Sequence, residues 1–99
     1  MNINRSKLEK LAKDLRKEEP RPAHLKLGNF EMAARTLDKC RATLLGIEGD
    51  YRFGCPMDQQ FFAEAGISAD EFQSVVATGA SDDEVARWVE QHADSESVR

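Results

Sequence analysis

The chain has 99 residues, of which 40% are hydrophobic, and a formal net charge of −4 at pH 7. This length allows one domain with one modest core and leaves no room for a second. No apolar run approaches the ~20 residues of a membrane-spanning helix. Because there is also no signal-peptide pattern, we expect a cytoplasmic protein whose two cysteines, Cys40 and Cys55, are reduced thiols.

The charges divide the chain into a basic half and an acidic half. Residues 1–53 contain 12 Lys and Arg and 8 Asp and Glu, whereas residues 54–99 contain 2 and 10. Such polarity can be a solvated surface, can draw the two halves together, or can leave a basic face for an acidic partner. The acidic balance and the lack of interleaved basic and aromatic residues argue against nucleic-acid binding.

The first predicted helix starts near Ser6, which has capping-box spacing to Glu9. An apolar stripe over residues 8–15 extends this amphipathic helix to about three turns, and docking on the protein's own core explains the stripe better than a membrane surface does. Residues 18–28 contain two prolines on either side of Arg21 and predict an extended linker.

The second predicted helix begins after Asn29 and ends at about Leu45, before a glycine. Apolar residues recur along it at steps of four and three, which places them on one face. The members of this face are Ala33, Leu37, Cys40, Leu44 and Ile47. Gly49-Asp50 then stands between short alternating segments and predicts a tiny β-hairpin at residues 47–53.

Three more helices follow. Cys55 and Pro56 suit the N-cap and first position of a helix over residues 56–65. Capping boxes beginning at Ser68 and Ser81 start the last two helices. We therefore predict an all-α fold of about five short helices around one core, forming a single domain over residues 1–93 with a polar tail at 94–99.

Four cations on or just after the second helix form the strongest candidate binding site: Arg35, Lys39, Arg41 and Arg52. Together with the N-terminus of the 56–65 helix they could hold a phosphate or a carboxylate. The competing interpretation is a salt-bridge ladder around Asp38, which lies three residues from two of the arginines.

The alternative site is Cys55, with Tyr51 and Asp58 nearby. A thiol at a helix N-terminus can serve as a nucleophile or a redox sensor. A catalytic cysteine also needs a base, and only His24 and His92 are present, so a capping role is the simpler interpretation. No short chelating pair predicts a metal site, and no cofactor fingerprint occurs.

Several short patterns in fixed order give the chain a resemblance. They are Arg35-x-x-Asp38-Lys39-x-Arg41-Ala42, then Gly49-x-Tyr51, then Cys55-Pro56-x-Asp58. From residue 14 to about 93 the chain resembles a family of small bacterial proteins catalogued as a domain of unknown function. The resemblance implies a bacterial, cytoplasmic, single-domain protein and supplies no activity.

The leading functional hypothesis is a non-catalytic binding or interaction module with an anion-preferring patch. A small anion or a protein is the expected partner, including a second copy of the chain in a homodimer. The alternative hypothesis is a small enzyme or redox sensor that uses Cys55.

Overall fold

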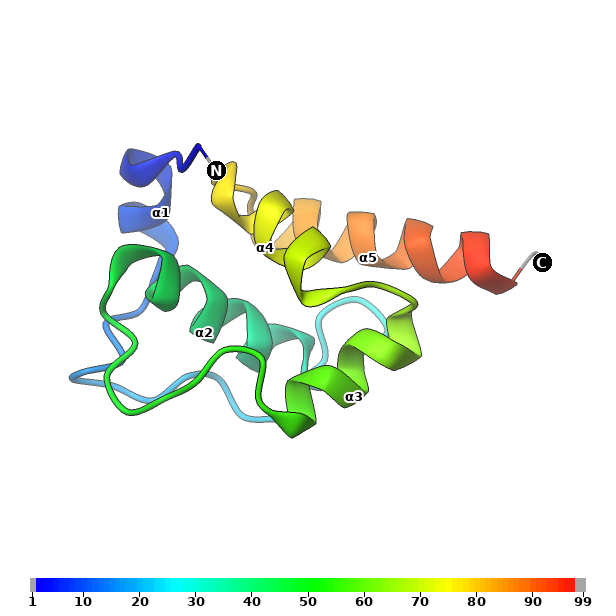
Figure 1. The fold of residues 1–99 in the computed structure, drawn as a ribbon, viewed down its shortest axis with the longest axis horizontal. Coiled ribbons are helices and arrows are strands. Elements are labelled where there is room, and N and C mark those ends of the chain that lie inside the picture. The colour runs from blue at the N-terminus through cyan, green and yellow to red at the C-terminus, as the bar shows by residue number, and fades with distance from the viewer. Residues whose placement is uncertain (1, 98–99) are drawn as a thin grey trace.

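The computed structural model describes the backbone of residues 2–97 and the side chains of residues 2–93, so the last two residues of the predicted tail lie outside the described part. The helices are α1 (Arg5–Leu11), α2 (Ala33–Leu45), α3 (Pro56–Ala65), α4 (Ala69–Ala77) and α5 (Asp82–Ser97) (Figure 1). The only strand-like pairing in this part of the chain is an isolated bridge between Leu27 and Phe30. The all-α prediction is confirmed. None of the described helices is long and apolar enough to cross a membrane.

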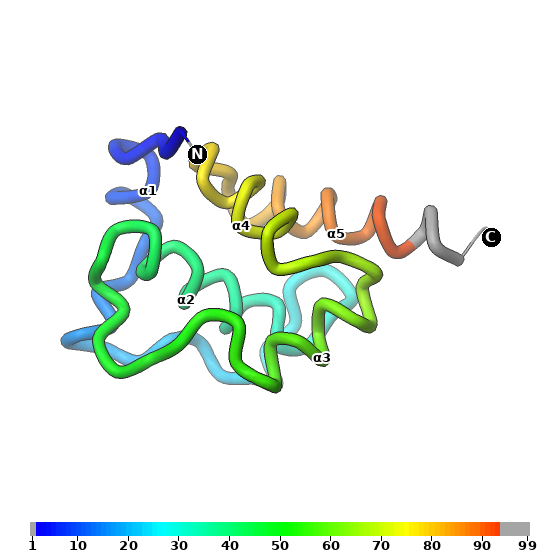
Figure 2. Tube along the Cα trace, in the orientation of Figure 1, coloured from blue at the N-terminus to red at the C-terminus, as the bar shows by residue number. Residues whose placement is uncertain are grey.

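Helix α2 occupies the middle of the molecule. It packs against α1 and α4, while α3 packs against α5. The long connection from α1 runs beside α2 in the opposite direction, and the trace in Figure 2 shows both it and the 46–55 loop following the length of α2. This path brings the linker, α2 and the start of α5 within reach of one another.

Phenylalanines fill the space between the helices. Phe61 and Phe62 of α3 and Phe72 of α4 are buried, with ring centroids 5.5 to 5.8 Å apart. Phe53 from the loop before α3 joins them, 5.9 Å from Phe62. The predicted apolar face of α2 supplies the other wall, since Leu37 and its apolar neighbours one turn away on that helix are buried.

The first two helices are shorter than predicted. Helix α1 ends at Leu11 because Ala12 is extended, and Asn4, not Ser6, is its N-cap. Leu15 is then free to bury itself and to donate its backbone N–H to Ile47 O at 3.1 Å, which a continued helix would prevent. Helix α2 starts at Ala33 because the preceding residue adopts a left-handed conformation, φ 71°.

The starts of the last three helices match the prediction. Cys55 is the N-cap of α3, with Pro56 in the first position. Ser68 forms the expected capping box with Glu71. The Ser81 hydroxyl accepts from the backbone of the residue three positions on, and the glutamate side chain there accepts from Ser81 N at 2.9 Å. The backbone of α5 continues to Ser97, beyond the predicted domain boundary at residue 93.

The predicted hairpin at 47–53 is wrong. A turn closed by Tyr51 N donating to Glu48 O at 3.1 Å replaces it. The backbone of Ile47 is already paired elsewhere, with the end of α2 and with Leu15. Phe53 turns inward to the aromatic core, which draws the second half of the segment away from the first.

Gly49 is the position in this loop where a side chain should be most harmful. Its φ is +60°, and an added Cβ would lie 2.8 Å from the backbone oxygen of Leu15, which cannot rotate away. We expect Gly49→Ala to lower the free energy of unfolding by about 2–3 kcal/mol, measured by urea denaturation. Gly46→Ala is the matched control, because its φ of +74° is similar and nothing lies within 4 Å. It should cost about 1 kcal/mol, and equal losses for the two variants would contradict the close packing of Gly49.

Candidate functional site

The four cations of the predicted anion patch lie in different surroundings. Arg35 is half-buried and places its guanidinium carbon 5.7 Å from the centre of the Tyr51 ring. Arg52 is exposed and lines a hollow of about 430 Å³ together with Tyr51. Lys39 and Arg41 are buried. Lys39 pairs with Asp58 of α3, and Arg41 pairs with Asp82 of α5. The structure therefore separates Lys39 from Arg41 and does not gather the four side chains around one pocket.

The first buried network centres on Asp58, whose exposed fraction is 0%. One carboxylate oxygen pairs with Lys39 Nζ at 2.8 Å and accepts from Gly54 N at 2.9 Å. The other accepts from the Thr36 hydroxyl at 2.7 Å. These bonds tie α2 to the start of α3, and they offset the large penalty for burying a charge.

Cys55 lies at the edge of this network. Its sulfur is 3.3 Å from Lys39 Nζ, while its side chain makes no capping bond to α3. The structure thus brings Cys55 and Asp58 to the same ammonium group. Tyr51, the third member of the predicted alternative site, lies against Arg35 instead. The cation beside the thiol is therefore Lys39, which the sequence did not link to Cys55.

The second buried network joins the linker, α2 and α5. Asp38 accepts from Arg21 three times, from the backbone N at 2.8 Å, from Nε at 3.0 Å and from Nη2 at 2.9 Å. Arg21 also donates through Nη1 to Asp82 at 2.7 Å. Arg41 donates to the other oxygen of Asp82 at 3.0 Å and to Ala80 O at 3.0 Å. Asp82 is therefore held between two guanidinium groups.

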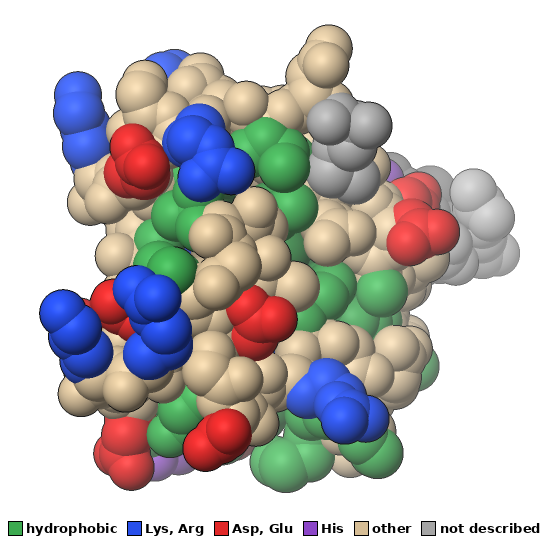
Figure 3. Space-filling view, turned by 60° about the vertical axis from the view of Figure 1, so that its left-hand side comes forward, with side chains coloured by type: hydrophobic (Ala, Val, Ile, Leu, Met, Phe, Trp, Pro, Cys, Tyr) green, Lys and Arg blue, Asp and Glu red, His purple; other side chains and the backbone are tan. Residues whose placement is uncertain are grey.

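Beside this network opens a hollow of about 290 Å³, which we call the arginine hollow. Its lining residues are Lys10, Leu11, Lys13, Arg21, Asp38, Arg41 and Asp82. Four of them are cations and two are carboxylates, so positive charge is in excess. Figure 3 shows the side of the molecule that carries α1, where Lys and Arg side chains are interspersed with acidic and apolar ones.

Arg41 has an unusual position in the arginine hollow. It is only 2% exposed, and its Nε finds no hydrogen-bond partner among the described residues. A buried donor without a partner is costly, and such a group is often explained by a ligand or an ordered water.

Asp82 carries a permanent charge in the neutral range. Burial alone would raise its pKa, but the hydrogen bonds and positive charge of Arg21 and Arg41 outweigh this effect and lower the pKa below its usual value. The two ion pairs are therefore intact above the ordinary pKa of 3.8 and are lost only as the pH falls through the lower pKa of the folded state.

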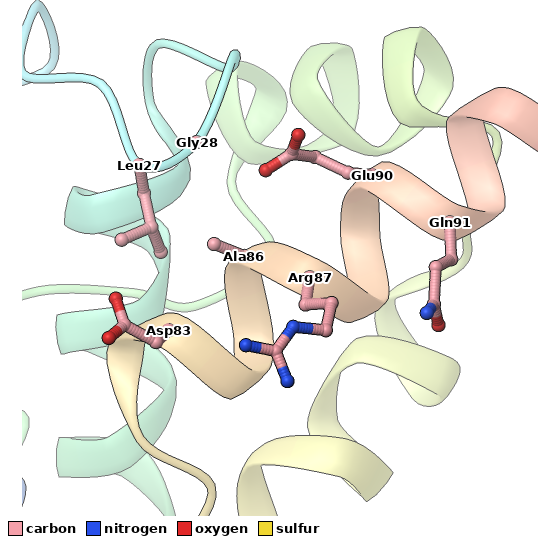
Figure 4. Close-up of a pocket in the computed structure, with 7 residues that line it drawn as sticks. All are labelled: Leu27, Gly28, Asp83, Ala86, Arg87, Glu90 and Gln91. Atoms are coloured by element: carbon pink, nitrogen blue, oxygen red, sulfur yellow. The ribbon is translucent and has the colours of Figure 1, made fainter.

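A larger hollow, of about 530 Å³, lies between the turn at Leu27 and one side of α5 (Figure 4). Its charged lining residues are of both signs, Asp83, Arg87 and Glu90. Asn29 donates to Glu90 at 3.3 Å. Charges of both signs line this hollow. It should therefore discriminate less between anionic and cationic ligands than the arginine hollow does.

The patch predicted from the sequence lacks Arg21, Asp82, Lys10 and Lys13. Arg21 carried a signal, since flanking prolines hold its backbone extended and present its side chain. Asp82 carried none, because an acidic residue in the first turn of a capped helix is already explained by the helix dipole. The contact between Arg21 and Asp82 spans 61 positions and depends on the tertiary fold.

Residues 17–99 match the model of the family described as Domain of unknown function (DUF5069). The match covers α2 to α5 and the buried residues of both networks, while Lys10 and Lys13 precede it. No curated protein matches the chain. Since the family match extends over well more than half of the sequence, the chain belongs to this domain family of unknown function.

Proposed function

We propose that the protein is a non-catalytic binding module that holds an anionic group in the arginine hollow. The observation that carries this proposal is Arg41, a buried guanidinium that lines the hollow and keeps one donor without a partner among the described residues. Guanidinium groups bind carboxylates and phosphates through paired hydrogen bonds, and they do so most strongly where water is excluded.

The other lining residues suit the same ligand. Lys10 is exposed at the rim, and Lys13 is partly exposed beside it. Lys13 Nζ donates to Glu19 O at 3.3 Å and lies 3.8 Å from the Glu18 carboxylate. Surface contacts of this kind are weak, so both ammonium groups can attract an anion. Leu11 is exposed to 37% and lies between them in the sequence, so it offers an apolar contact to whatever carries the anionic group.

The proposal changes the membership of the predicted patch. Arg41 stays in it, and Arg21, Lys10 and Lys13 join it. The ammonium of Lys39 already serves Asp58 and Cys55, and Arg35 and Arg52 lie near Tyr51. Bacterial origin, a cytoplasmic location and homodimerisation stay predictions from the sequence.

The first test is thermal unfolding with and without phosphate, sulfate or citrate. An anion at ten times its Kd should stabilise the protein by about 1.4 kcal/mol, which raises the Tm of a domain this small by roughly 5–10 °C. The double variant Lys10→Gln, Lys13→Gln should lose most of that shift. Lys26→Gln, an exposed lysine of the linker, removes charge outside the hollow and should keep it. Equal losses in the two variants would refute a localised site.

A second candidate function is supported by the contact between Lys39 and Cys55. The Lys39 ammonium lies 3.3 Å from the Cys55 sulfur, and Cys55 is partly accessible. A partly accessible thiol beside a cation is the setting of a redox-sensing cysteine, which hydrogen peroxide oxidises to a sulfenic acid. Because the same ammonium is already paired with Asp58, we place this candidate second.

The expected result for this candidate is selective reaction of Cys55. Iodoacetamide at pH 7 should alkylate Cys55 about tenfold faster than glutathione, while Cys40 stays unmodified because burial raises the pKa of its thiol far above the usual range. Mass spectrometry of the tryptic peptides distinguishes the two cysteines. A Cys55 rate equal to or below that of glutathione would exclude the redox-sensor hypothesis and leave Cys55 as the residue that precedes α3.

A further inference from the structure

Asp82 occupies the position that an external anion would take. Its carboxylate lies between Arg21 Nη1, at 2.7 Å, and Arg41 Nη1, at 3.0 Å. The other carboxylate of the arginine hollow, Asp38, is only 3% exposed and is fixed by the three Arg21 donors, whereas the Asp82 side chain is 40% exposed. Asp82 is therefore the member of the network that can rotate towards solvent without opening the core.

We propose that Asp82 is a built-in competitor for the anion site, and that the ligand which displaces it carries the dianionic group of a phosphate monoester. This inference rests on the proposed function, since it concerns the same hollow. It adds the class of ligand and the residue that sets the affinity for it.

The charges around the hollow favour a dianion. Lys10, Lys13, Arg21 and Arg41 supply four positive charges, Asp38 cancels one of them, and Glu18 lies 3.8 Å from Lys13 Nζ. When Asp82 turns away, at least two positive charges remain for the ligand, so a second negative charge on it is compensated. A monoanion only replaces the carboxylate that it displaces and gains little.

The donors point to the same ligand. The carboxylate of Asp82 has two oxygens and uses one donor from each arginine as its closest contacts. A phosphate monoester has three terminal oxygens, and the residues that line the hollow carry those two donors, two lysine ammonium groups and the buried, unpartnered Nε of Arg41. A ligand with three acceptor oxygens can use donors that Asp82 leaves unused.

The chain offers a matched pair of variants. Asp82→Asn removes the competing charge from the first turn of α5, and Asp83→Asn removes the same charge from the next position of the same turn. Asp83 makes no ion pair with Arg21 or Arg41 and lines the other, larger hollow. Both variants change the net charge and the helix N-terminus equally, so only the contact with the arginines distinguishes them.

The ligands are matched as well. Methyl phosphate at pH 8 is a dianion, because its second pKa is about 6, and methyl sulfate has the same shape with one negative charge. Calorimetric titration of the wild-type protein should give a Kd for methyl phosphate about tenfold below that for methyl sulfate, as expected for one more compensated charge. Acetyl-phosphoserine-amide in a third titration separates a phosphorylated protein segment from a free phosphate ester as the source of the group. Tighter binding than methyl phosphate identifies the former, and equal or weaker binding the latter.

The variants decide the role of Asp82. Asp82→Asn should bind methyl phosphate at least tenfold more tightly than the wild type, and Asp83→Asn should stay within twofold of it. If Asp82→Asn does not fold, Asp82→Ser keeps the test, since serine is favoured at a helix start and has no charge. Two results would overturn this inference while the proposed function stands, provided that the wild type binds through Lys10 and Lys13. One is that the two aspartate variants bind methyl phosphate alike, and the other is that methyl sulfate binds as tightly as methyl phosphate. If no anion binds the wild type or Asp82→Asn, both are overturned.

Discussion

Replacing Asp58 with asparagine is expected to lower the free energy of unfolding by about 3–5 kcal/mol, the usual cost of removing one partner from a buried ion pair. The side chain is fully buried, and its two oxygens serve Lys39, Thr36 and the backbone of Gly54. The amide keeps the shape but leaves the Lys39 ammonium buried without a counter-charge. Urea denaturation at pH 7 measures the loss.

The control is the double variant Asp58→Asn, Lys39→Met. Methionine resembles the lysine stem in length and adapts to irregular spaces, so it removes the buried charge without opening a large cavity. We expect the double variant to be more stable than Asp58→Asn alone, because an uncompensated buried charge is more harmful than an apolar replacement. A double variant that is less stable than either single variant would show that the two losses add, and would contradict the expected penalty of an uncompensated buried charge.

The second large effect is expected at Asp38. Asp38→Ala should lower the free energy of unfolding by about 2–4 kcal/mol, because Arg21 loses three hydrogen bonds to a nearly buried carboxylate and keeps only Asp82 as a charged partner. The linker between α1 and α2 should also become mobile, since this carboxylate holds the backbone of Arg21. Urea denaturation measures the first effect, and amide hydrogen exchange of residues 20–23 measures the second.

Asp14 provides a control with almost the same hydrogen-bond geometry. It accepts from Arg16 through the backbone N at 3.0 Å and through two guanidinium nitrogens at 2.9 Å, but this pair lies at the surface. Exposed ion pairs contribute little, because water and salt screen them. Asp14→Ala should therefore change stability far less than Asp38→Ala. Similar losses would mean that burial adds nothing to the Asp38 pair.

The elements that the sequence predicted well are those determined by local rules. The start of α3 follows from Pro56, and the starts of α4 and α5 follow from capping boxes that the structure contains. The apolar periodicity of α2 identified residues that pack into the core, although Asp38, Lys39 and Arg41 off that face are buried as well. Each of these features depends on residues within a few positions of one another, where spacing alone specifies the contact.

Most of the errors involve partners that are distant in the sequence, whereas the N-cap of α1, which is Asn4 and not Ser6, is a local error. The hairpin fails because Ile47 pairs with Leu15 and because Gly49 packs against the backbone there. The anion patch was drawn from residues close together on α2 and its turn, yet helical spacing directs Lys39 to α3 and Arg41 to α5. Asp82, Lys10 and Lys13 join Arg41 only through the tertiary fold.

The nitrogen-15 NMR signal of the Arg41 Nε–H group, followed during a phosphate titration, tests anion binding in the arginine hollow at the residue itself. This donor belongs to a residue that lines the arginine hollow, and it has no hydrogen-bond partner among the described residues, so we expect an anion in the hollow to change its surroundings. Arg41→Lys assigns the signal, and the exposed Arg52 provides an internal comparison. We predict a saturable shift of the Arg41 signal. The double variant Lys10→Gln, Lys13→Gln should abolish that shift, and Arg52 should show no saturable shift. An Arg41 signal that stays fixed while other signals titrate would contradict this prediction.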